Sequence, residues 1–159
     1  MIRSICDLSD DYPDAVQTGE SRFRDYGSLR RFHGRIDTIK CHEDNLLLKQ
    51  TLATSGQGRV MVVDGGGSLR RALFGDKLGA LLVENGWAGI IVNGAVRDVE
   101  MLAQMPLAAR ALNVCPTRPQ QHGTGERGIV VRFAGVTFRP GDWLYADENG
   151  FLVSASELS

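Results

Sequence analysis

Hydrophobic residues in this 159-residue chain form both continuous runs and periodic patterns. Continuous apolar runs rich in β-branched residues occupy 59–64 and 89–94, and each leads into glycine and polar residues. Such runs are typical of strands that are buried on both faces of a parallel sheet. Between them, leucines recur at helical spacing over 78–85, and Gly86 follows. Strand, helix and strand in this order predict a right-handed parallel crossover.

The N-terminal third shows weaker patterns. Up to about Gln17 we expect short helices, with Asp7 or Ser9-Asp10 as caps and Pro13 in an early turn. Imperfect alternation over 32–41 predicts a strand. The leucine pattern over 45–53 predicts a helix that a glycine-containing turn closes.

Beyond Pro106 the pattern changes to short apolar segments separated by glycine, Pro-Gly and Asn-Gly turns. Such spacing is typical of antiparallel hairpins. The segments expected as strands are 129–133, 136–138, 143–146 and 151–153. Residues 1–159 therefore predict a single α/β domain in which helices and strands alternate first and sheet dominates the last third.

Composition and charge exclude several classes of protein. Hydrophobic residues make up 43% of the chain, charged residues 23% and aromatic residues 7%, as in ordinary globular domains. The net charge is −1 and no segment concentrates Lys and Arg, so we expect no direct nucleic-acid partner. The chain has no apolar run near the ~18 residues of a membrane span and no signal-peptide pattern at its start. We therefore expect a cytoplasmic protein with no membrane contact.

Cysteine usage gives little sign of a disulfide framework or a structural zinc site. The three cysteines are widely spaced and form no Cys-x-x-Cys pair. Cys41-His42-Glu43-Asp44 does place a thiol, an imidazole and two carboxylates together, as a nucleophile or metal site would. Neighbouring residues on a strand point to opposite faces, however, so we favour a structural role for this segment.

Candidate chemistry follows the two buried strands, because ligands of open α/β sheets bind beyond the carboxyl ends of strands. After the first strand, Asp64-Gly65-Gly66-Gly67-Ser68 is reminiscent of a phosphate cradle, but it has neither Gly-x-Gly-x-x-Gly nor Walker spacing. A tight turn that lets two backbones approach is the favoured interpretation. After the second strand comes Asn93-Gly94-Ala95-Val96-Arg97-Asp98.

Asp76 and the Arg97-Asp98 pair stand at opposite ends of the expected crossover. Asp76 is a plausible helix N-cap, and the first turn of that helix would present free N–H groups to an anion. An Arg beside an Asp is often only a surface ion pair. A helix and strand of these lengths would nevertheless return the chain to the same edge and bring all three side chains to one crevice. Carboxylate oxygens select Mg²⁺ or Mn²⁺, and Arg recognises a carboxylate bidentately.

Twenty residues separate Asp76 from the Arg97-Asp98 pair. This spacing resembles the Asp-x20-Arg-Asp signature of the 4-hydroxy-4-methyl-2-oxoglutarate aldolases. These belong to the superfamily named after the regulator of ribonuclease E activity A (RraA-like). The resemblance covers almost the whole chain. Further segments that look like the family are 40–45, 62–68, 94–98, 135–138 and 145–147.

The resemblance implies a swivelling β/β/α fold with a central mixed sheet, and assembly as homotrimers or dimers of trimers with sites near subunit interfaces. Transferred to this chain, Gly75, Asp76, Lys77 and Leu78 would contact substrate. Arg97 would bind the substrate, and Asp98 would ligate a divalent cation, Mg²⁺ or Mn²⁺. Asp76 would order water held by that cation.

The implied activity is that of a class II aldolase, which cleaves 4-hydroxy-4-methyl-2-oxoglutarate to pyruvate and also decarboxylates oxaloacetate. Lys77 suggests a Schiff-base aldolase instead, but an exposed first-turn lysine has neither the burial nor the lowered pKa that this chemistry needs. His33, His122 and Trp143 are further residues that could line the region beyond the oxo-acid head.

A protein-binding function is the main alternative, since family members named as regulators bind and inhibit ribonuclease E. Regulators of that type tend to lose one or both acidic residues of the signature, whereas this chain has Asp76 and Asp98. A methyltransferase label is sometimes attached to such sequences. The glycine-rich loop here has no nucleoside-binding pattern around it, so the sequence does not support that label. We therefore favour the enzyme and keep the regulator as the second hypothesis.

Overall fold

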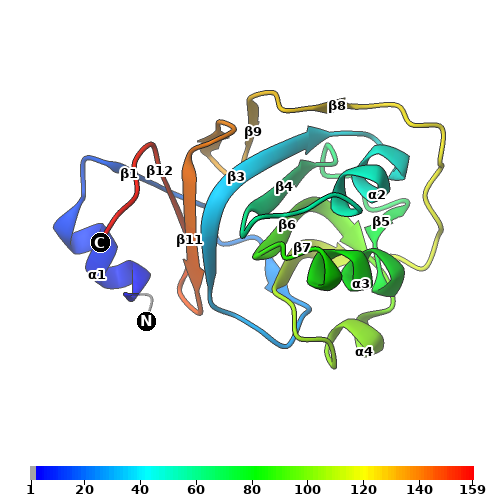
Figure 1. Ribbon diagram of the computed structural model, residues 1–159, viewed down its shortest axis with the longest axis horizontal. Coiled ribbons are helices and arrows are strands. Elements are labelled where there is room, and N and C mark those ends of the chain that lie inside the picture. Colours follow the sequence, from blue (N-terminus) through cyan, green and yellow to red (C-terminus); the bar gives the residue numbers. More distant parts are fainter. Residues whose placement is uncertain (1–2) are drawn as a thin grey trace.

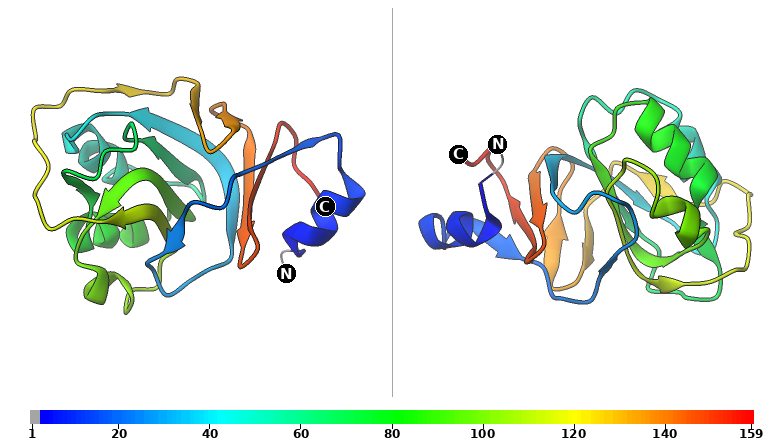
Figure 2. Two further views of the ribbon diagram at one scale, coloured as in Figure 1. Left: turned by 180° about the vertical axis from the view of Figure 1, so that it is seen from behind. Right: turned by 90° about the horizontal axis from the view of Figure 1, so that it is seen from below.

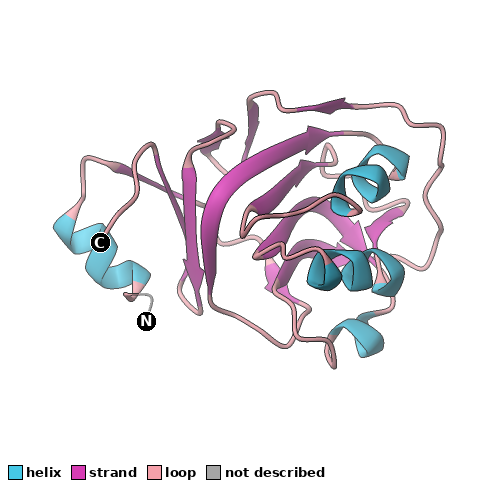
Figure 3. Ribbon diagram, viewed as in Figure 1, coloured by secondary structure: helices cyan, strands magenta, loops and turns pink. Residues whose placement is uncertain are grey.

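The computed structural model describes residues 3–159 and centres on a ten-stranded mixed sheet (Figures 1 and 3). The helices are α1 (Ile5–Asp11), α2 (Leu46–Leu52), α3 (Asp76–Glu84) and α4 (Val99–Leu102). The strands of the large sheet are β1 (Val16–Thr18), β2 (Arg24–Asp25), β3 (Phe32–Lys40), β4 (Val60–Asp64), β5 (Ala72–Phe74), β6 (Gly89–Val96), β7 (Ala109–Val114), β8 (Glu126–Arg127), β11 (Trp143–Asp147) and β12 (Gly150–Ser154). A separate hairpin pairs β9 (Val131–Phe133) with β10 (Val136–Phe138).

The parallel half of the sheet contains β3, β4, β6 and β7 in that order, with β5 added beside the end of β6. Helices α2 and α3 cover one face of this half (Figure 1). Met61 and Val63 of β4 pack into the cluster on that face, whereas Val60 and Val62 pack into the cluster on the other. Burial on both faces explains why the sequences of these strands are continuous apolar runs. The parallel pairing of β4 with β6, with α3 between them in the chain, confirms that the crossover is parallel, as predicted.

The other half of the sheet is antiparallel and reaches beyond β3 through β11, β12 and β1 (Figure 2). The β9–β10 hairpin contributes Val131, Val136 and Phe138 to the core cluster that also contains β4 residues. The hairpins expected in the last third of the chain are therefore confirmed. The fold is the predicted α/β domain with a central mixed sheet.

The N-terminal prediction of short helices up to Gln17 was only partly right. One helix, α1, ends at Asp11, and Ser4 rather than Asp7 or Ser9 caps it, since the Ser4 hydroxyl accepts the Cys6 N–H. Pro13 lies after this helix. Residues 16–18 form a strand instead, because pairing with β12 at the sheet edge outweighs the weak local pattern.

Besides β1, five elements were not predicted, namely β2, β5, α4, β7 and β8. Asp76 is the first residue of α3, not its N-cap, which is Gly75. The carboxylate that meets this helix end belongs to Asp98 of the next loop, so a side chain distant in sequence takes the role expected of Asp76. No helix within residues 3–159 is long and apolar enough to cross a membrane.

Candidate functional site

A pocket of about 320 Å³ lies where β5 leads into α3 and where β6 ends. The backbone N–H of Arg97 donates to the Phe74 carbonyl oxygen at 2.9 Å, which ties the two loops together. The predicted site residues that line this pocket are Gly75, Asp76, Lys77, Leu78, Arg97 and Asp98. The structure thus brings every predicted site residue to one hollow, although their separation along the chain reaches 23 positions.

Asp98 is held in an uncommon backbone conformation. Its φ is +56°, in the left-handed region, which costs a non-glycine residue free energy and often marks a functional position. Its Oδ2 accepts the Asp76 N–H at 3.2 Å. A Cβ on Gly75 would lie 2.5 Å from the same Oδ2 and 2.9 Å from Cγ of Arg97, so a side chain there would displace these groups. The lack of a side chain at Gly75 therefore sets the position of both motif residues.

Arg97 keeps most of its binding capacity. Its Nε lies 3.8 Å from Oδ1 of Asp98, too far for a hydrogen bond, and the two side chains are 33% and 31% exposed. The first turn of α3 adds two donors, because the N–H groups of Lys77 and Leu78 have no partner within residues 3–159. The pocket thus offers an anion a guanidinium and two backbone N–H groups.

The donor set of the pocket suits a hard divalent cation. Within residues 3–159, no cluster of three or more His, Cys, Asp or Glu side chains could enclose a metal ion. Asp76 and Asp98 nevertheless supply two carboxylates to one wall. Mg²⁺ takes one or two protein carboxylates and keeps several waters, whereas Zn²⁺ sites need three or four protein ligands. The residues present fit Mg²⁺ or Mn²⁺ and do not fit a structural zinc site.

Six residues that line the pocket were not predicted, and three of them have polar side chains: Asn45, Arg118 and Gln121. Asn45 donates from Nδ2 to the Leu73 carbonyl oxygen at 3.0 Å and thereby joins α2 to the β5 wall. Arg118 and Gln121 belong to the long connection between β7 and β8. Only the family-like segment 40–45 could have indicated Asn45, and no local signal in the sequence marks Arg118.

Comparison with known proteins shows the family of this chain. The model of the family "RraA-like: Aldolase/RraA" matches residues 3–153. The chain belongs to this RraA-like family. A relative from Ectopseudomonas mendocina is 52% identical over 96% of this chain and 94% of its own length, and it is named "Putative 4-hydroxy-4-methyl-2-oxoglutarate aldolase". A relative from Pseudomonas fluorescens with the same name is 51% identical over 96% of this chain and 93% of its own.

Two solved structures have nearly the same fold as this RraA-like protein. The RNA-processing inhibitor RraA from Thermus thermophilis has a TM-score of 0.96 at 41% identity, covering 100% of this chain and 96% of that one. An S-adenosylmethionine:2-dimethylmenaquinone methyltransferase from Geobacillus kaustophilus has a TM-score of 0.96 at 40% identity, covering 98% and 97%. The names given to RraA-like proteins therefore span an aldolase, an inhibitor and a methyltransferase.

The glycine-rich loop of this RraA-like protein uses its N–H groups internally. Those of Gly65 and Gly67 both donate to the Asn93 carbonyl oxygen at 3.1 Å, and that of Gly66 donates to Oδ1 of Asp64 at 3.0 Å. A Cβ on Gly65 would lie 2.8 Å from the Asn93 oxygen. The loop is the predicted close approach of two backbones, and its donors are not directed at a phosphate.

The Cys41-His42-Glu43-Asp44 segment follows β3 and does not converge on one atom. Burial, together with the charges of Asp44 and Asp64, raises the pKa of the Cys41 thiol to about 12, so it stays protonated and unreactive. Glu43 accepts from Oγ of Ser68 and from Nε of Arg70, both at 2.7 Å, and these bonds lower its pKa. The segment has the structural role that we favoured.

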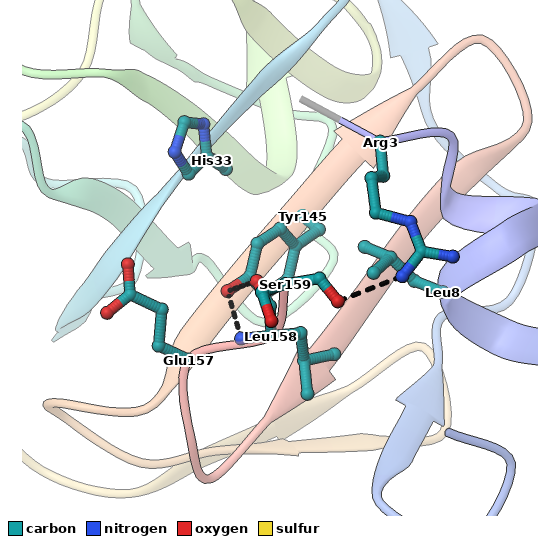
Figure 4. Close-up of a pocket in the computed structure, with 7 residues that line it drawn as sticks. All are labelled: Arg3, Leu8, His33, Tyr145, Glu157, Leu158 and Ser159. Carbon is teal, nitrogen blue, oxygen red and sulfur yellow. Dashed lines mark hydrogen bonds between the residues drawn. The ribbon is translucent and has the colours of Figure 1, made fainter. Parts of the chain in front are cut away.

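His33, His122 and Trp143 do not line the pocket. His33 stacks on Tyr145 and borders a separate hollow near the C-terminus (Figure 4). Trp143 lies under the guanidinium of Arg35 on the antiparallel half of the sheet. The N–H of His122 donates to Asp44 at 2.7 Å. The pocket is therefore bordered by the β7–β8 connection rather than by these aromatic residues.

Proposed function

We propose that this protein is a divalent-metal-dependent class II aldolase. It cleaves 4-hydroxy-4-methyl-2-oxoglutarate to two molecules of pyruvate and also decarboxylates oxaloacetate. The observation that carries the proposal is the single pocket that combines Asp76, Arg97 and the left-handed Asp98. The names of relatives at 51–52% identity support the same reaction.

Asp98 would hold the cation, with Asp76 beside it ordering water. A bound Mg²⁺ or Mn²⁺ would supply Lewis-acid stabilisation of negative charge on the keto oxygen of a 2-oxo acid. No zinc-type cage competes for this role among the described residues. Removal of divalent cations with a chelator should therefore abolish activity, and Mg²⁺ or Mn²⁺ should restore it.

The remaining roles belong to the protein's own groups. Arg97 would bind the carboxylate next to the keto group, and the N–H groups of Lys77 and Leu78 would help to hold the oxo-acid head. Asp76 would accept, through a water molecule, the proton of the 4-hydroxyl group. The C3–C4 bond then breaks, its electron pair forms the enolate of one pyruvate, and C4 becomes the keto carbon of the other. From oxaloacetate the same enolate forms by loss of CO₂.

The decisive test is a coupled assay of pyruvate release with Mg²⁺, using 4-hydroxy-4-methyl-2-oxoglutarate and oxaloacetate. We expect the Asp98→Ala variant to lose at least ~100-fold in kcat. Glu100→Ala removes an exposed carboxylate two residues further on and is the matched control, with activity close to wild type. Equal release by wild type and Asp98→Ala would refute the enzyme hypothesis.

A Schiff-base mechanism through Lys77 makes a different prediction. Lys77 is exposed on the first turn of α3, where nothing desolvates its amine. Borohydride in the presence of pyruvate should therefore leave the protein mass unchanged. A covalent adduct on Lys77, together with activity that resists the chelator, would replace the metal mechanism with an imine mechanism.

The second candidate function is a regulator that binds and inhibits ribonuclease E. It is favoured by the close match to a structure named as an RNA-processing inhibitor. The two functions separate in one experiment, because inhibition of purified ribonuclease E that survives in Asp98→Ala would not depend on the catalytic pocket. We also propose assembly as a homotrimer or dimer of trimers, which light scattering would detect as three or six chains of 17.3 kDa.

A further inference from the structure

The pocket contains more positive charge than an oxo-acid head requires. Its charged lining residues are Asp76, Lys77, Arg97, Asp98 and Arg118. Under the proposed function, Arg97 and the cation bind the head of the substrate. Among residues 3–159, neither Lys77 nor Arg118 has a carboxylate within 4 Å of its charged group. Two cationic side chains therefore remain available to a second anionic group.

Arg118 differs from Lys77 in how firmly its backbone is held. The Thr117 carbonyl oxygen accepts the Ala72 N–H at 2.9 Å, and the Arg118 carbonyl oxygen accepts Nη1 of Arg71 at 2.8 Å. Two residues further on, Gln120 accepts the Asn45 N–H at 3.0 Å. Ala72 and Asn45 themselves line the pocket, so Arg118 is anchored on both sides to the pocket wall.

The chemistry of the two side chains also favours Arg118 over Lys77 as the group that recognises an anion. The guanidinium of Arg is a planar fork that matches a carboxylate bidentately, whereas Lys is a flexible point charge. Lys77 is exposed in the first turn of α3 and adds positive potential without defining a shape. Arg118 is therefore the residue suited to bind a carboxylate group, because hydrogen bonds hold its backbone in place.

We propose that Arg118 is the specificity-determining residue of this pocket and binds the distal carboxylate of a dicarboxylic 4-hydroxy-2-oxo acid. The inference rests on the proposed function, because it assigns the far end of the same substrate. A monocarboxylic analogue would leave the guanidinium without a partner, so it should be selected against.

Two matched substrates test the inference. 4-Hydroxy-2-oxoglutarate and 4-hydroxy-2-oxopentanoate differ only in a carboxylate or a methyl group on C4, and both release pyruvate on cleavage. We expect Arg118→Gln to lower kcat/KM for the dicarboxylate by about 10- to 100-fold and to change that for the monocarboxylate by less than about 2-fold. Arg118→Lys should retain part of the preference.

Arg70→Gln is the matched control. Arg70 is a 75% exposed arginine near the same edge of the sheet, pairs with Glu43, and does not line the pocket. Its replacement removes the same charge, so it reports any general electrostatic effect. The quantity compared is the ratio of kcat/KM for the dicarboxylate to kcat/KM for the monocarboxylate. If Arg70→Gln lowers this ratio as much as Arg118→Gln does, the proposal is overturned.

A binding measurement separates this inference from the proposed function. 2-Oxoglutarate and 2-oxopentanoate have no 4-hydroxyl group and cannot be cleaved, and calorimetry with the Mg²⁺-loaded protein compares their affinities. We expect Arg118→Gln to weaken the binding of 2-oxoglutarate about 10-fold or more and to leave the affinity for 2-oxopentanoate unchanged. If no substrate is cleaved but this difference appears, the aldolase proposal fails and the role of Arg118 stands. Equal weakening of both ligands, or of neither, refutes the role of Arg118 whatever the activity.

Discussion

The absence of a side chain at Gly75 leaves room for the side chains of Arg97 and Asp98. Its φ of −152° is extended backbone that any residue adopts, so alanine would cause no strain there. The added Cβ would instead overlap Oδ2 of Asp98 at 2.5 Å. We expect Gly75→Ala to displace the Asp98 carboxylate and to lower kcat by ~100-fold, because misplacement by about 1 Å has effects of this size.

The control for this variant is Gly94→Ala on β6. A Cβ at Gly94 would find its nearest neighbour at 3.5 Å, an ordinary van der Waals contact. Circular dichroism and thermal unfolding of both variants would show whether the fold is retained. A folded Gly75→Ala protein with wild-type pyruvate release would contradict the role given to the Gly75–Asp98 contact.

The sequence predicted the motif residues but not the side chains that complete the pocket. Asp76, Arg97 and Asp98 follow recognisable strands and helices, so periodicity and topology place them at one edge. Arg118 lies instead in a connection without regular structure, and its position depends on hydrogen bonds to Ala72 and Arg71. Such bonds between distant segments leave no periodic signal in the sequence.

Helices and strands, too, were predicted where the local sequence pattern determines them and missed where contacts with distant segments do. β4 and β6 were predicted because burial on both faces makes them uniformly apolar. β7 was missed because Arg110 interrupts its apolar run, although this arginine is buried and hydrogen-bonded. β5 has only three residues, and pairing with β6 rather than local propensity makes it a strand.

The connection from β7 to β8, residues 115–125, is fastened by the buried carboxylate of Asp44 (Figure 1, yellow). Asp44 accepts the N–H groups of His122 at 2.7 Å, Gly123 at 3.1 Å and Leu46 at 3.2 Å. We expect Asp44→Ala to lower the free energy of unfolding by about 2–4 kcal/mol, because three part-buried hydrogen bonds lose their shared acceptor. Hydrogen exchange should accelerate at His122 and Gly123.

Glu126→Ala, at an exposed residue of β8 directly after this connection, should change stability by less than about 0.5 kcal/mol. The effect of Asp44 also depends on pH. Burial raises the pKa of Asp44, but the hydrogen bonds that it accepts from N–H groups outweigh the effect of burial. The pKa of Asp44 is therefore below its usual value. The stabilisation is therefore complete above about pH 4 and is lost as pH falls through the lower folded-state pKa. A wild-type advantage that grew on acidification would contradict this assignment.

At the scale of the whole molecule, Arg110 joins the parallel half of the sheet to the antiparallel half. From β7 it donates to Oδ1 of Asp25 at 3.0 Å, to the Gly150 carbonyl oxygen at 2.7 Å and also to the Asp147 carbonyl oxygen. Its guanidinium lies 5.3 Å from the centre of the Phe32 ring. These partners come from β2, β3, β11 and β12, so one side chain satisfies polar groups from both halves.

Arg110→Met keeps much of the volume of this side chain but leaves the carbonyl oxygens of Asp147 and Gly150 without this donor, and Asp25 with only the exposed Arg30 as an ion-pair partner. We expect it to lower the free energy of unfolding in urea by about 3–5 kcal/mol, as when one partner of a buried ion pair is removed. Arg24→Met, on the exposed face of β2, should cost less than about 0.5 kcal/mol. Because much of the expected loss comes from the charge of Asp25, which then has only the exposed Arg30 beside it, the double variant Arg110→Met/Asp25→Asn should be more stable than the sum of the two single effects predicts. Additive effects would show instead that the link between the halves depends on packing around Arg110 and not on its charge.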